Sequence, residues 1–295
     1  MTGVAVIAHQ NKQLGGGLGE LRQTLADAGV TAPLWFEVPK SKKAPAMARR
    51  AVEKGADLVF VWGGDGMVQR CIDALAGTGV TVAILPAGTA NLLAANLGVP
   101  EDLGEAVRIG LHGRRRALDL GVVNGEHFGV MAGTGFDALM IRDTDSGLKD
   151  KVGRLAYVTT GWRHLRVEPV GMRVDVDGHR WFEGPATCAL IGNVGTIMGG
   201  VTAFDDARPD DGWLEIGMVT AEGPVQWARV FARMALSRSE RSPFVQTTRG
   251  TKVDIRLDRK MPYELDGGDR KPTKKLKVRV EPAAITVCVP EEAPS

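Results

Sequence analysis

The sequence predicts two domains of different class: an N-terminal α/β domain with a mostly parallel sheet, and a C-terminal, mainly antiparallel β-sandwich-like domain. The chain has 295 residues, more than the about 100–200 that one domain usually contains. Strand-like apolar runs alternate with helical patterns as far as Arg114–Arg116, and short Val- and Ile-rich segments separated by turn pairs follow. We therefore predict an α/β domain over residues 1–120 and a β-rich domain over residues 121–295.

The elements of the first domain follow from short apolar runs and helical repeats. A strand at Val4–Ile7 precedes a polar, glycine-rich stretch and a helix over Glu20–Ala28, in which Leu21 and Leu25 share one face. Strands alternating with helices in this way indicate βαβ crossovers and a parallel sheet. The remaining strands are expected at Leu34–Val38, Leu58–Trp62 and Thr81–Leu85, and the helices at Pro45–Lys54, Met67–Ala76 and Asn91–Leu97.

The second domain reads as short strands joined by tight turns. Asn124-Gly125 and Asp177-Gly178 are dipeptides typical of two-residue hairpin turns. Two helices, Val152–Leu165 and Pro224–Ser237, interrupt the strands, and the last strand, Ala284–Val289, could return to either domain. The other strands are expected at Ala117–Val123, His127–Met131, Gly171–Val176, His179–Phe182, Ala186–Ile191, Leu214–Val219, Lys252–Leu257 and Leu276–Val280.

Composition narrows the class of protein. Hydrophobic residues make up 44% of the chain and charged residues 24%, which is typical of a globular protein with a sizeable core. The formal net charge of +2 is too small to predict wholesale nucleic-acid binding. Cys71, Cys188 and Cys288 form no close pair, which favours a reducing compartment over a disulfide framework. No run of about 18 apolar residues occurs, so any membrane contact should be peripheral.

A glycine-rich turn after a buried-type strand carries the strongest chemical indication. Val59–Trp62 runs directly into the Gly-Gly-Asp-Gly sequence Gly63–Gly66 and then into a helix. Glycines at such a turn let backbone N–H groups and the helix N-terminus face an anion without a Cβ in the way. Because Asp65 would repel polyphosphate directly, it is better suited to holding Mg²⁺ or to orienting a substrate hydroxyl. The alternative is a tight turn in which Asp65 caps the helix.

The same arrangement recurs one βα unit later. The strand ending at Leu85 is followed by a turn containing Gly88, with Thr89 and Asn91 near the start of the next helix. Carboxyl ends of adjacent parallel strands lie at one edge of a sheet, where open α/β sheets bind ligands. We therefore expect the two turns to form one site. Helix capping is the alternative for Thr89 and Asn91.

These two motifs, at this spacing, resemble the diacylglycerol kinase catalytic-domain family, which includes bacterial soluble lipid kinases and the sphingosine and ceramide kinases. Further resemblances follow in the family's order over residues 58 to 290. Gly133–Ala138 resembles the family's G-x-G-x-D-A, Lys151–Tyr157 its basic-G-x-x-x-Y helix start, Asn193–Gly200 its N-x-x-x-x-G-G, Arg208–Gly212 its P-x-A-x-x-D-G, and Leu265–Gly267 its final D-G-E.

The resemblance implies a two-domain fold of the NAD kinase and diacylglycerol kinase type, with the nucleotide between the domains. ATP would be the phosphoryl donor, a lipid hydroxyl the acceptor, and Mg²⁺ the cofactor. Asp211, with the backbone carbonyls of Arg208 and Trp213, would match a structural Mg²⁺ site, for which an Asp-Gly turn is the alternative. The residues that would form the ATP site are Gly63, Gly64, Asp65, Gly66, Met67, Gly88, Thr89 and Asn91.

The final motif departs most from the family pattern. The family's Glu is the proposed general base, and Gly268 stands in its place, followed by Asp269. A base must reach the proton of the attacking hydroxyl. Asp269 is therefore our first candidate, with Asp266 and Asp65 as alternatives. Without a base, catalysis would rest on positioning and charge neutralisation. In a second departure, Met67 replaces the Thr that usually follows the first turn.

Other functions stay open beside the lipid kinase. An NAD kinase shares the Gly-Gly-Asp-Gly turn and the two-domain plan, but it would be expected to carry an N-E pair and a G-S-T-A-Y stretch, which this sequence lacks. A non-catalytic nucleotide or lipid sensor is suggested by Gly268. The pattern Gly133–Ala138 formally fits a dinucleotide fingerprint, but it lies in the β-rich half without a clear βαβ frame, so we set it aside.

The expected partners are a lipid at the inner membrane leaflet and, as an option, a second copy in a homodimer, with no nucleic acid. Arg114–Arg116 and the cluster Lys271, Lys274, Lys275 and Lys277 could attract anionic headgroups, at about 1 kcal/mol per residue near a charged membrane. Solvated surface charge is the preferred interpretation of both runs. The predicted location is cytoplasmic with peripheral membrane association.

Overall fold

The computed structural model describes residues 3–12, 14–135, 168–197, 201–234 and 242–291. The chain divides into two compact units, and we call them unit 1 and unit 2. Unit 1 comprises Met1–Leu120 together with Pro282–Ser295, and unit 2 comprises Gly121–Glu281. The last strand, which the sequence left open between the domains, therefore ends in unit 1.

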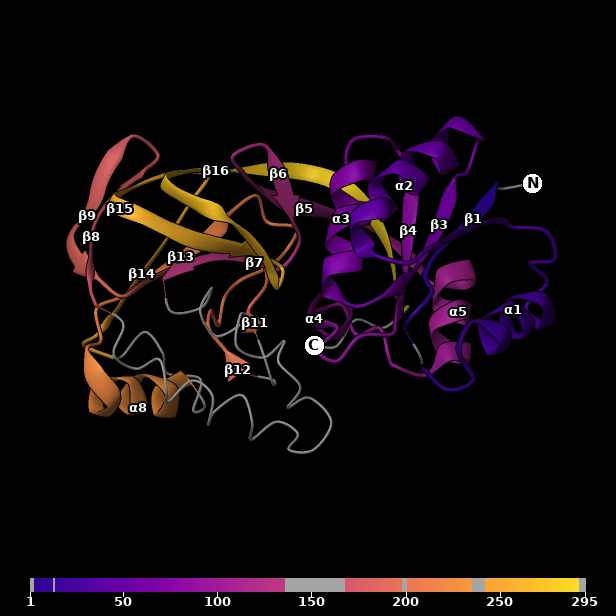
Figure 1. Cartoon of the computed structure of the whole chain (residues 1–295), viewed down its shortest axis with the longest axis horizontal. Helices are drawn as coiled ribbons and strands as arrows, with labels where there is room; N and C mark the ends of the chain where they lie inside the picture. Colours follow the sequence, from indigo (N-terminus) through magenta and orange to yellow (C-terminus); the bar gives the residue numbers. More distant parts are fainter. Residues whose placement is uncertain (1–2, 13, 136–167, 198–200, 235–241, 292–295) are drawn as a thin grey trace. The chain divides into compact units, whose positions relative to one another are not determined.

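Unit 1 is an α/β unit in which β1 to β4 and the end of β16 pair in parallel. Its strands follow the order β16-β4-β3-β1-β2. Helices α2 and α3 lie on one side of the strands and α1 and α5 on the other (Figure 1). Its elements are β1 (Val4–His9), α1 (Gly17–Asp27), β2 (Leu34–Val38), the short 3₁₀ helix η1 (Ser41–Lys43), α2 (Ala44–Glu53), β3 (Leu58–Gly63), α3 (Asp65–Leu75), β4 (Thr81–Pro86), α4 (Leu92–Asn96), α5 (Leu103–His112) and β5 (Arg114–Val123), which continues into unit 2.

The sequence of unit 1 explains this layering. Helices cover both faces of a parallel sheet, so its central strands are continuous apolar runs, and β3 is buried from end to end. Helix α5 was missing from the prediction. Its start is capped by Asp102, whose side chain accepts the Glu105 N–H at 2.8 Å. A Cβ on Gly110 would lie 2.2 Å from the Phe60 ring, so glycine lets α5 pack closely against the sheet.

Unit 2 is mainly antiparallel β, as the sequence predicts. The predicted segment His127–Met131 is two strands rather than one, and β14 was not predicted. The predicted helix Val152–Leu165 and the end of the other predicted helix, at Ser237, lie outside the described residues. The elements are β6 (Glu126–Phe128), β7 (Met131–Gly135), β8 (Val170–Val176), β9 (His179–Ala186), β10 (Cys188–Gly192), β11 (Thr196–Ile197), β12 (Val201–Thr202), β13 (Leu214–Val219), α8 (Gly223–Met234), β14 (Val245–Gly250), β15 (Lys252–Leu265) and β16 (Gly268–Val289), whose last residues belong to unit 1.

The long strand β15 organises unit 2. Its first half, Lys252–Leu257, pairs with β8 and β16, and its last residues, Tyr263–Leu265, pair with β7 and β16. Register shifts separate the two halves, starting after Arg256, so the strand changes neighbours partway along its length. Buried side chains such as Ile255 of β15 and Ile191 of β10 meet in one core cluster. This arrangement fits the predicted sandwich-like class.

The predicted hairpin turns carry the left-handed backbone that their residues favour. Asn124 and Gly125 have φ of 51° and 94°, and Asp177 and Gly178 have φ of 48° and 86°. Among the helices of the described ranges, none has both the length and the apolar character needed to cross a membrane.

Candidate active site

The turns that follow β3 and β4 in unit 1 lie in van der Waals contact. A Cβ on Gly88 would lie 2.5 Å from the Gly64 Cα, and a Cβ on Gly64 would lie 3.0 Å from the Gly88 Cα. A Cβ on Gly63 would lie 2.5 Å from the Met67 Cβ. Side chains at these three positions would collide with neighbouring atoms, so the approach of the two turns requires glycine. The two motifs therefore form one continuous surface at the carboxyl edge of the sheet.

The Asp65 carboxylate joins the two turns. Its Oδ2 atom accepts the Asn91 N–H at 3.0 Å, and its Oδ1 atom accepts the Leu92 N–H at 2.5 Å. Both donors lie at the start of α4, where helix N–H groups have no partner within the helix. Burial raises the pKa of Asp65, although the backbone N–H donors oppose this rise. Each oxygen of Asp65 thus has a partner within the protein.

Asn91 fixes the second turn in a similar way. Its backbone has a left-handed φ of 48°. Its Oδ1 atom accepts the Gly88 N–H at 2.8 Å, and its Nδ2 atom donates to the Gly88 carbonyl at 3.0 Å and to Glu101 at 3.3 Å. The side chain is buried. Asn91 therefore holds the turn in shape from the protein side. It is the residue before α4, but its side chain makes no capping bond to that helix, so the capping alternative is wrong for this side chain.

Gly66 differs from the other glycines of the first turn. A Cβ there would meet nothing within 4 Å, so packing among the described residues does not explain the glycine. Gly66 is the second residue of α3, where the N–H groups of a helix point outward. Thr89 is exposed on the neighbouring turn, whereas Met67 is only 2% exposed and its N–H donates to the Gly64 carbonyl at 2.8 Å. Gly66 and Thr89 thus border open space, and the Met67 side chain belongs to the core.

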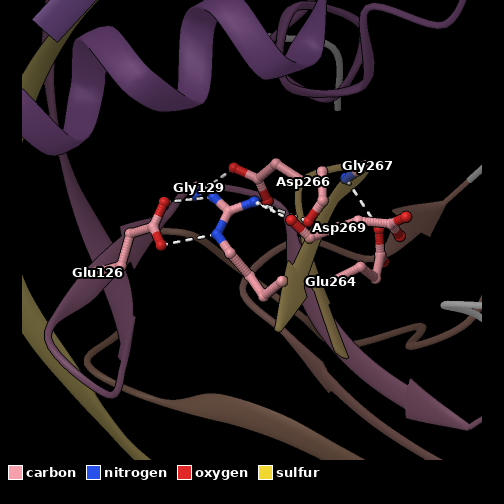
Figure 2. A network of polar contacts seen from close by, with 8 residues as sticks. Glu126, Gly129, Glu264, Asp266, Gly267 and Asp269 are labelled. Atoms are coloured by element: carbon pink, nitrogen blue, oxygen red, sulfur yellow. Dashed lines mark hydrogen bonds and ion pairs between the residues drawn. The ribbon is translucent and has the colours of Figure 1, made fainter. Parts of the chain in front are cut away.

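The Asp-Gly sequence at the end of β15 forms a tight hairpin turn in unit 2. Asp266 and Gly267 have φ of 44° and 78°, the combination that a two-residue hairpin favours. The Asp266 carboxylate is buried and accepts the N–H groups of Gly129, Val130 and Met131 at 2.7, 2.9 and 2.9 Å. Figure 2 shows this carboxylate facing Gly129. Because its oxygens bind three backbone donors, Asp266 is poorly placed to accept a substrate proton.

The guanidinium of Arg270 lies beside Gly268, the position at which the family has its glutamate. A Cβ on Gly268 would lie 2.8 Å from Nη1 of Arg270, and this atom donates to the carbonyls of Gly268 at 2.8 Å and Asp269 at 3.1 Å. The guanidinium is held by both oxygens of Glu126, with a 2.7 Å bond from Nε. Figure 2 places Glu126, Asp266 and Asp269 around one polar network. Asp269 itself is exposed.

Sequence reasoning missed two buried acids, Glu264 and Asp119, and it named Asn193 only as the start of a motif. Glu264 is 1% exposed and accepts the Gly267 N–H at 3.0 Å, so it closes the hairpin turn. Asn193 donates to the Gly129 carbonyl at 3.0 Å, on the same loop that Asp266 holds. Asp119, in unit 1, accepts the Ala283 N–H at 2.8 Å. For the two acids, the available indication was an acidic residue within an otherwise apolar strand, which usually means a specific hydrogen-bond partner.

The loop predicted to hold Mg²⁺ is an Asp-Gly turn with hard oxygen donors. Gly212 has a φ of 80°, and the Asp211 Oδ1 atom accepts the Trp213 N–H at 3.0 Å. Asp211 and Arg208 are exposed. The exposed Asp211 carboxylate is a hard oxygen ligand of the kind that Mg²⁺ prefers. In the part of the chain that the structure describes, no group of three or more His, Cys, Asp or Glu side chains could hold a metal.

The structure also settles the dinucleotide alternative for the second glycine pattern. Gly133 and Gly135 lie within β7, which pairs antiparallel with β10 and with β15. A dinucleotide fingerprint follows a strand of a parallel βαβ unit. The remaining residues of this pattern, the motif Lys151–Tyr157 and the pair Gly199-Gly200 lie outside the described residues.

Comparisons with known proteins match both units. Residues 6–123 match the model of the diacylglycerol kinase catalytic domain, and residues 130–289 match the YegS C-terminal NAD kinase beta sandwich-like domain. A diacylglycerol kinase of Mycobacterium tuberculosis is 32% identical over 70% of this chain and 68% of its own length. A Pseudomonas aeruginosa protein named probable lipid kinase YegS-like is 32% identical over 84% of this chain and 82% of its own length.

The fold comparison agrees with these matches. The crystal structure of a diacylglycerol kinase from Bacillus anthracis superposes with a TM-score of 0.80. It is 23% identical and covers 97% of this chain and 96% of its own. The predicted two-domain fold class is confirmed.

Proposed function

We propose that this chain, which belongs to the diacylglycerol kinase catalytic-domain family of bacterial lipid kinases, transfers the γ-phosphoryl group of ATP to a lipid hydroxyl. Diacylglycerol or a related lipid is the proposed acceptor. The acceptor oxygen attacks the γ-phosphorus, a new P–O bond forms, and the bond to the oxygen that bridges the β- and γ-phosphates breaks. ADP leaves, and the hydroxyl proton passes to a base on the protein.

The observation that carries this proposal is the open space over Gly66. The neighbouring glycines are needed for packing within the protein, but the missing side chain of Gly66 leaves room that no described residue fills. That room lies over the first turn of α3, where the helix dipole and outward N–H groups favour a phosphate. The exposed Thr89 hydroxyl borders the same surface and supplies a donor for a phosphate oxygen.

Asp65 and Asn91 are positioning residues in the proposed reaction. Each binds backbone groups that hold the two turns together. Phosphoryl transfer depends mainly on positioning and on neutralisation of charge. The two side chains therefore contribute by fixing where the phosphate lies, and the carboxylate of Asp65 contributes this without needing to contact the nucleotide.

Asp269 is the base that we assign. It is exposed, whereas Asp266 is committed to three backbone N–H groups. Arg270 binds the Gly268 and Asp269 carbonyls and so fixes the backbone that carries the Asp269 side chain. A positioned carboxylate that accepts the proton typically contributes about 10²–10⁴-fold to the rate.

Mg²⁺ is the cofactor that we expect, with Asp211 and the carbonyls of Arg208 and Trp213 as ligands of a structural site. The Asp-Gly turn brings hard oxygen atoms to one exposed loop. Mg²⁺ that accompanies ATP would neutralise charge on the phosphates.

One feature favours a second candidate function, a sensor that binds nucleotide or lipid without transfer. Gly268 stands where the resemblance places the catalytic glutamate. If Asp269 cannot take over the proton, nucleotide binding would remain and turnover would be lost.

Radiolabelled ATP, Mg²⁺ and a panel of extracted lipids separate these functions. We expect labelled phosphate in one lipid class, with diacylglycerol as the first candidate, and none in NAD. The variant Gly66→Ala should bind ATP about tenfold or more weakly, because its methyl group enters the space reserved for phosphate. Its fold should be intact, since alanine favours a helix over glycine by about 1 kcal/mol.

Gly104→Ala is the matched control. Gly104 is the second residue of α5, as Gly66 is of α3, and a Cβ there would meet only the Asp102 Oδ1 atom at 3.5 Å, an ordinary contact. We expect unchanged ATP affinity in this control. Equal ATP affinity in the two variants would remove the Gly66 site. ATP binding without transfer to any lipid would favour the sensor, and transfer to NAD would favour an NAD kinase.

A further inference from the structure

The hairpin that joins β15 to β16 is held by one segment of unit 2, residues 126–131. Before the turn, the Asp266 carboxylate accepts the N–H groups of residues 129, 130 and 131, and the Asp266 N–H donates to the Met131 carbonyl at 3.0 Å. After the turn, Glu126 of β6 binds Arg270 of β16 (Figure 2). The same short segment therefore binds the hairpin on both sides of its turn.

The Glu126–Arg270 pair has the geometry of a specific ion pair. Both carboxylate oxygens accept guanidinium N–H groups, with a 2.7 Å bond from Nε to Oε2. Only 11% of the Arg270 side chain and 28% of the Glu126 side chain are exposed. Burial alone would lower the pKa of Arg270, but the hydrogen bonds and the charge of Glu126 outweigh it and raise the pKa. Because bidentate bonds between arginine and a carboxylate fix orientation as well as distance, Glu126 determines where the guanidinium lies.

The guanidinium in turn holds the backbone of Asp269. Its Nη1 atom donates to the Gly268 carbonyl at 2.8 Å and to the Asp269 carbonyl at 3.1 Å. These carbonyls belong to the two peptide groups that flank the Asp269 Cα atom. Because each peptide group is planar, holding both of them restricts the φ and ψ of Asp269 and thus the direction of its Cα–Cβ bond. The exposed Asp269 side chain therefore starts from a defined position.

Stability alone does not account for this arrangement. A partly buried ion pair is weak evidence for stability, because the cost of removing two charges from water offsets their attraction. Nη1 also occupies the space next to Gly268, where a Cβ would lie 2.8 Å away from it. A functional side chain, in contrast, needs a support that is itself locked by hydrogen bonds, and the ion pair provides such a support for Asp269.

We infer that Glu126 is a positioning residue of the phosphoryl transfer, acting through Arg270 on the Asp269 carboxylate. The inference rests on the proposed function, in which Asp269 accepts the proton of the lipid hydroxyl. Glu126 contacts neither ATP nor lipid in this scheme. It orients the guanidinium, and the guanidinium holds the two peptide groups that direct the base. A base must lie within hydrogen-bond reach of its proton, so a displacement of about 1 Å can cost about 100-fold in rate.

Two substitutions in the pair test the inference by steady-state kinetics with diacylglycerol, ATP and Mg²⁺. Arg270→Lys keeps the positive charge, but one ammonium group cannot bind both Glu126 oxygens and both carbonyls. Glu126→Gln keeps the shape and removes the negative charge. We expect kcat to fall about 10–100-fold in the first variant and about tenfold in the second, with KM for ATP unchanged within about twofold. A normal kcat in both variants would overturn the inference.

A second arginine–glutamate pair, in α5 of unit 1, provides the matched control. Arg108 binds both oxygens of Glu105, with Nε at 2.8 Å and Nη2 at 2.6 Å, and the two side chains are 53% and 42% exposed. Arg108→Lys should leave kcat unchanged. An equal fall in kcat in Arg108→Lys and Arg270→Lys would contradict a special role for the Glu126 pair.

A double variant distinguishes positioning of the base from a purely structural effect. If Arg270 acts through Asp269, adding Arg270→Lys to Asp269→Asn should lower kcat no further, because the group that Arg270 positions is already gone. A structural effect would instead lower kcat by the same factor in both backgrounds, and that result would remove Glu126 and Arg270 from the mechanism.

Two further outcomes separate this inference from the proposed function. Near-normal turnover of Asp269→Asn would overturn the inference together with the assignment of the base, while the kinase stands. If no lipid is ever phosphorylated, the proposed function fails, and NMR relaxation of the full chain still decides whether the pair fixes Asp269. The order parameter of the Asp269 N–H should be about 0.85 in the unaltered chain and below about 0.6 in Arg270→Lys. Equal values in the two proteins would show that the pair does not position this residue.

Discussion

Asp65 in unit 1 and Asp266 in unit 2 belong to different motifs, yet they do similar structural work. Each carboxylate binds backbone N–H groups of a neighbouring loop: Asp65 binds Asn91 and Leu92, and Asp266 binds Gly129, Val130 and Met131.

The two acids differ in burial and in what lies beside them. Asp266 is 2% exposed, and Asp65 is partly exposed next to the open space over Gly66. The comparison teaches that an acidic residue in a motif can serve to hold a neighbouring loop, so the motif alone does not identify a group that acts on a substrate.

The largest expected effect is on the rate of phosphorylation, and it distinguishes Asp269 from Asp65 and Asp266, the two acids that bind backbone N–H groups. Asp269→Asn should lower the rate of lipid phosphorylation by about 10²–10⁴-fold, because an amide cannot accept the hydroxyl proton. ATP affinity and the unfolding midpoint should stay unchanged, since Asp269 is exposed. Steady-state kinetics with ATP binding measured in parallel checks this. Near-normal turnover would exclude Asp269 as the base and return the question to Asp266 and Asp65.

A large loss of stability should mark Asp266 as a structural acid. Asp266→Ala leaves three buried N–H groups without their acceptor, which should destabilise unit 2 by about 3–5 kcal/mol. Urea unfolding, with hydrogen exchange at the amides of residues 129, 130 and 131, reports the change.

Asp258→Ala is the matched control for Asp266. The Asp258 side chain accepts one exposed N–H, that of Gly171, at 2.9 Å, and its loss should cost about 1 kcal/mol or less. Similar losses in the two variants would contradict the special role of Asp266.

The smallest expected effect is a change with pH in the unfolding free energy that depends on Asp65. Burial raises its pKa in the folded state, so the folded chain binds this proton more tightly than the unfolded chain does. This contribution to stability is therefore greatest at low pH and is lost as pH rises from the ordinary aspartate pKa of 3.8 through the raised pKa of the folded state. The difference in unfolding free energy between the unaltered chain and Asp65→Asn should shift in that direction across this window. A pH-independent difference would show that Asp65 has an ordinary pKa.

Much of the fold could be predicted because its physical causes are local. The alternation of apolar runs and helical repeats, with Asn124-Gly125 and Asp177-Gly178 at the turns, was sufficient for the two-domain class. Helix α5 was missed although Asp102 and Glu105 form a start pattern for it. The merging of Lys252–Leu257 into the longer strand β15 was also missed, because register shifts and changes of neighbour depend on contacts distant in sequence.

The glycines of the candidate site could be predicted from the sequence, but the roles of its acidic residues could not. Gly64 and Gly88 were singled out as turn residues, and their close approach could not be known before the strands were paired. The hydrogen-bond partners of Asp266 lie more than 130 residues away in the chain. The sequence motif therefore could not show whether this carboxylate binds backbone N–H groups or accepts a substrate proton. The part that Arg270 plays beside Gly268 is likewise visible only in three dimensions.

The arrangement of Arg270 determines what a side chain at position 268 would meet. A glutamate at position 268 would bring its Cβ to 2.8 Å from the Arg270 Nη1 atom, whose guanidinium is held by Glu126 with only 11% of the Arg270 side chain exposed. Any side chain at position 268 would therefore require the end of the Arg270 side chain to move. Because that end is a flexible guanidinium, the movement costs little in itself, and its main consequence would be a changed ion pair with Glu126.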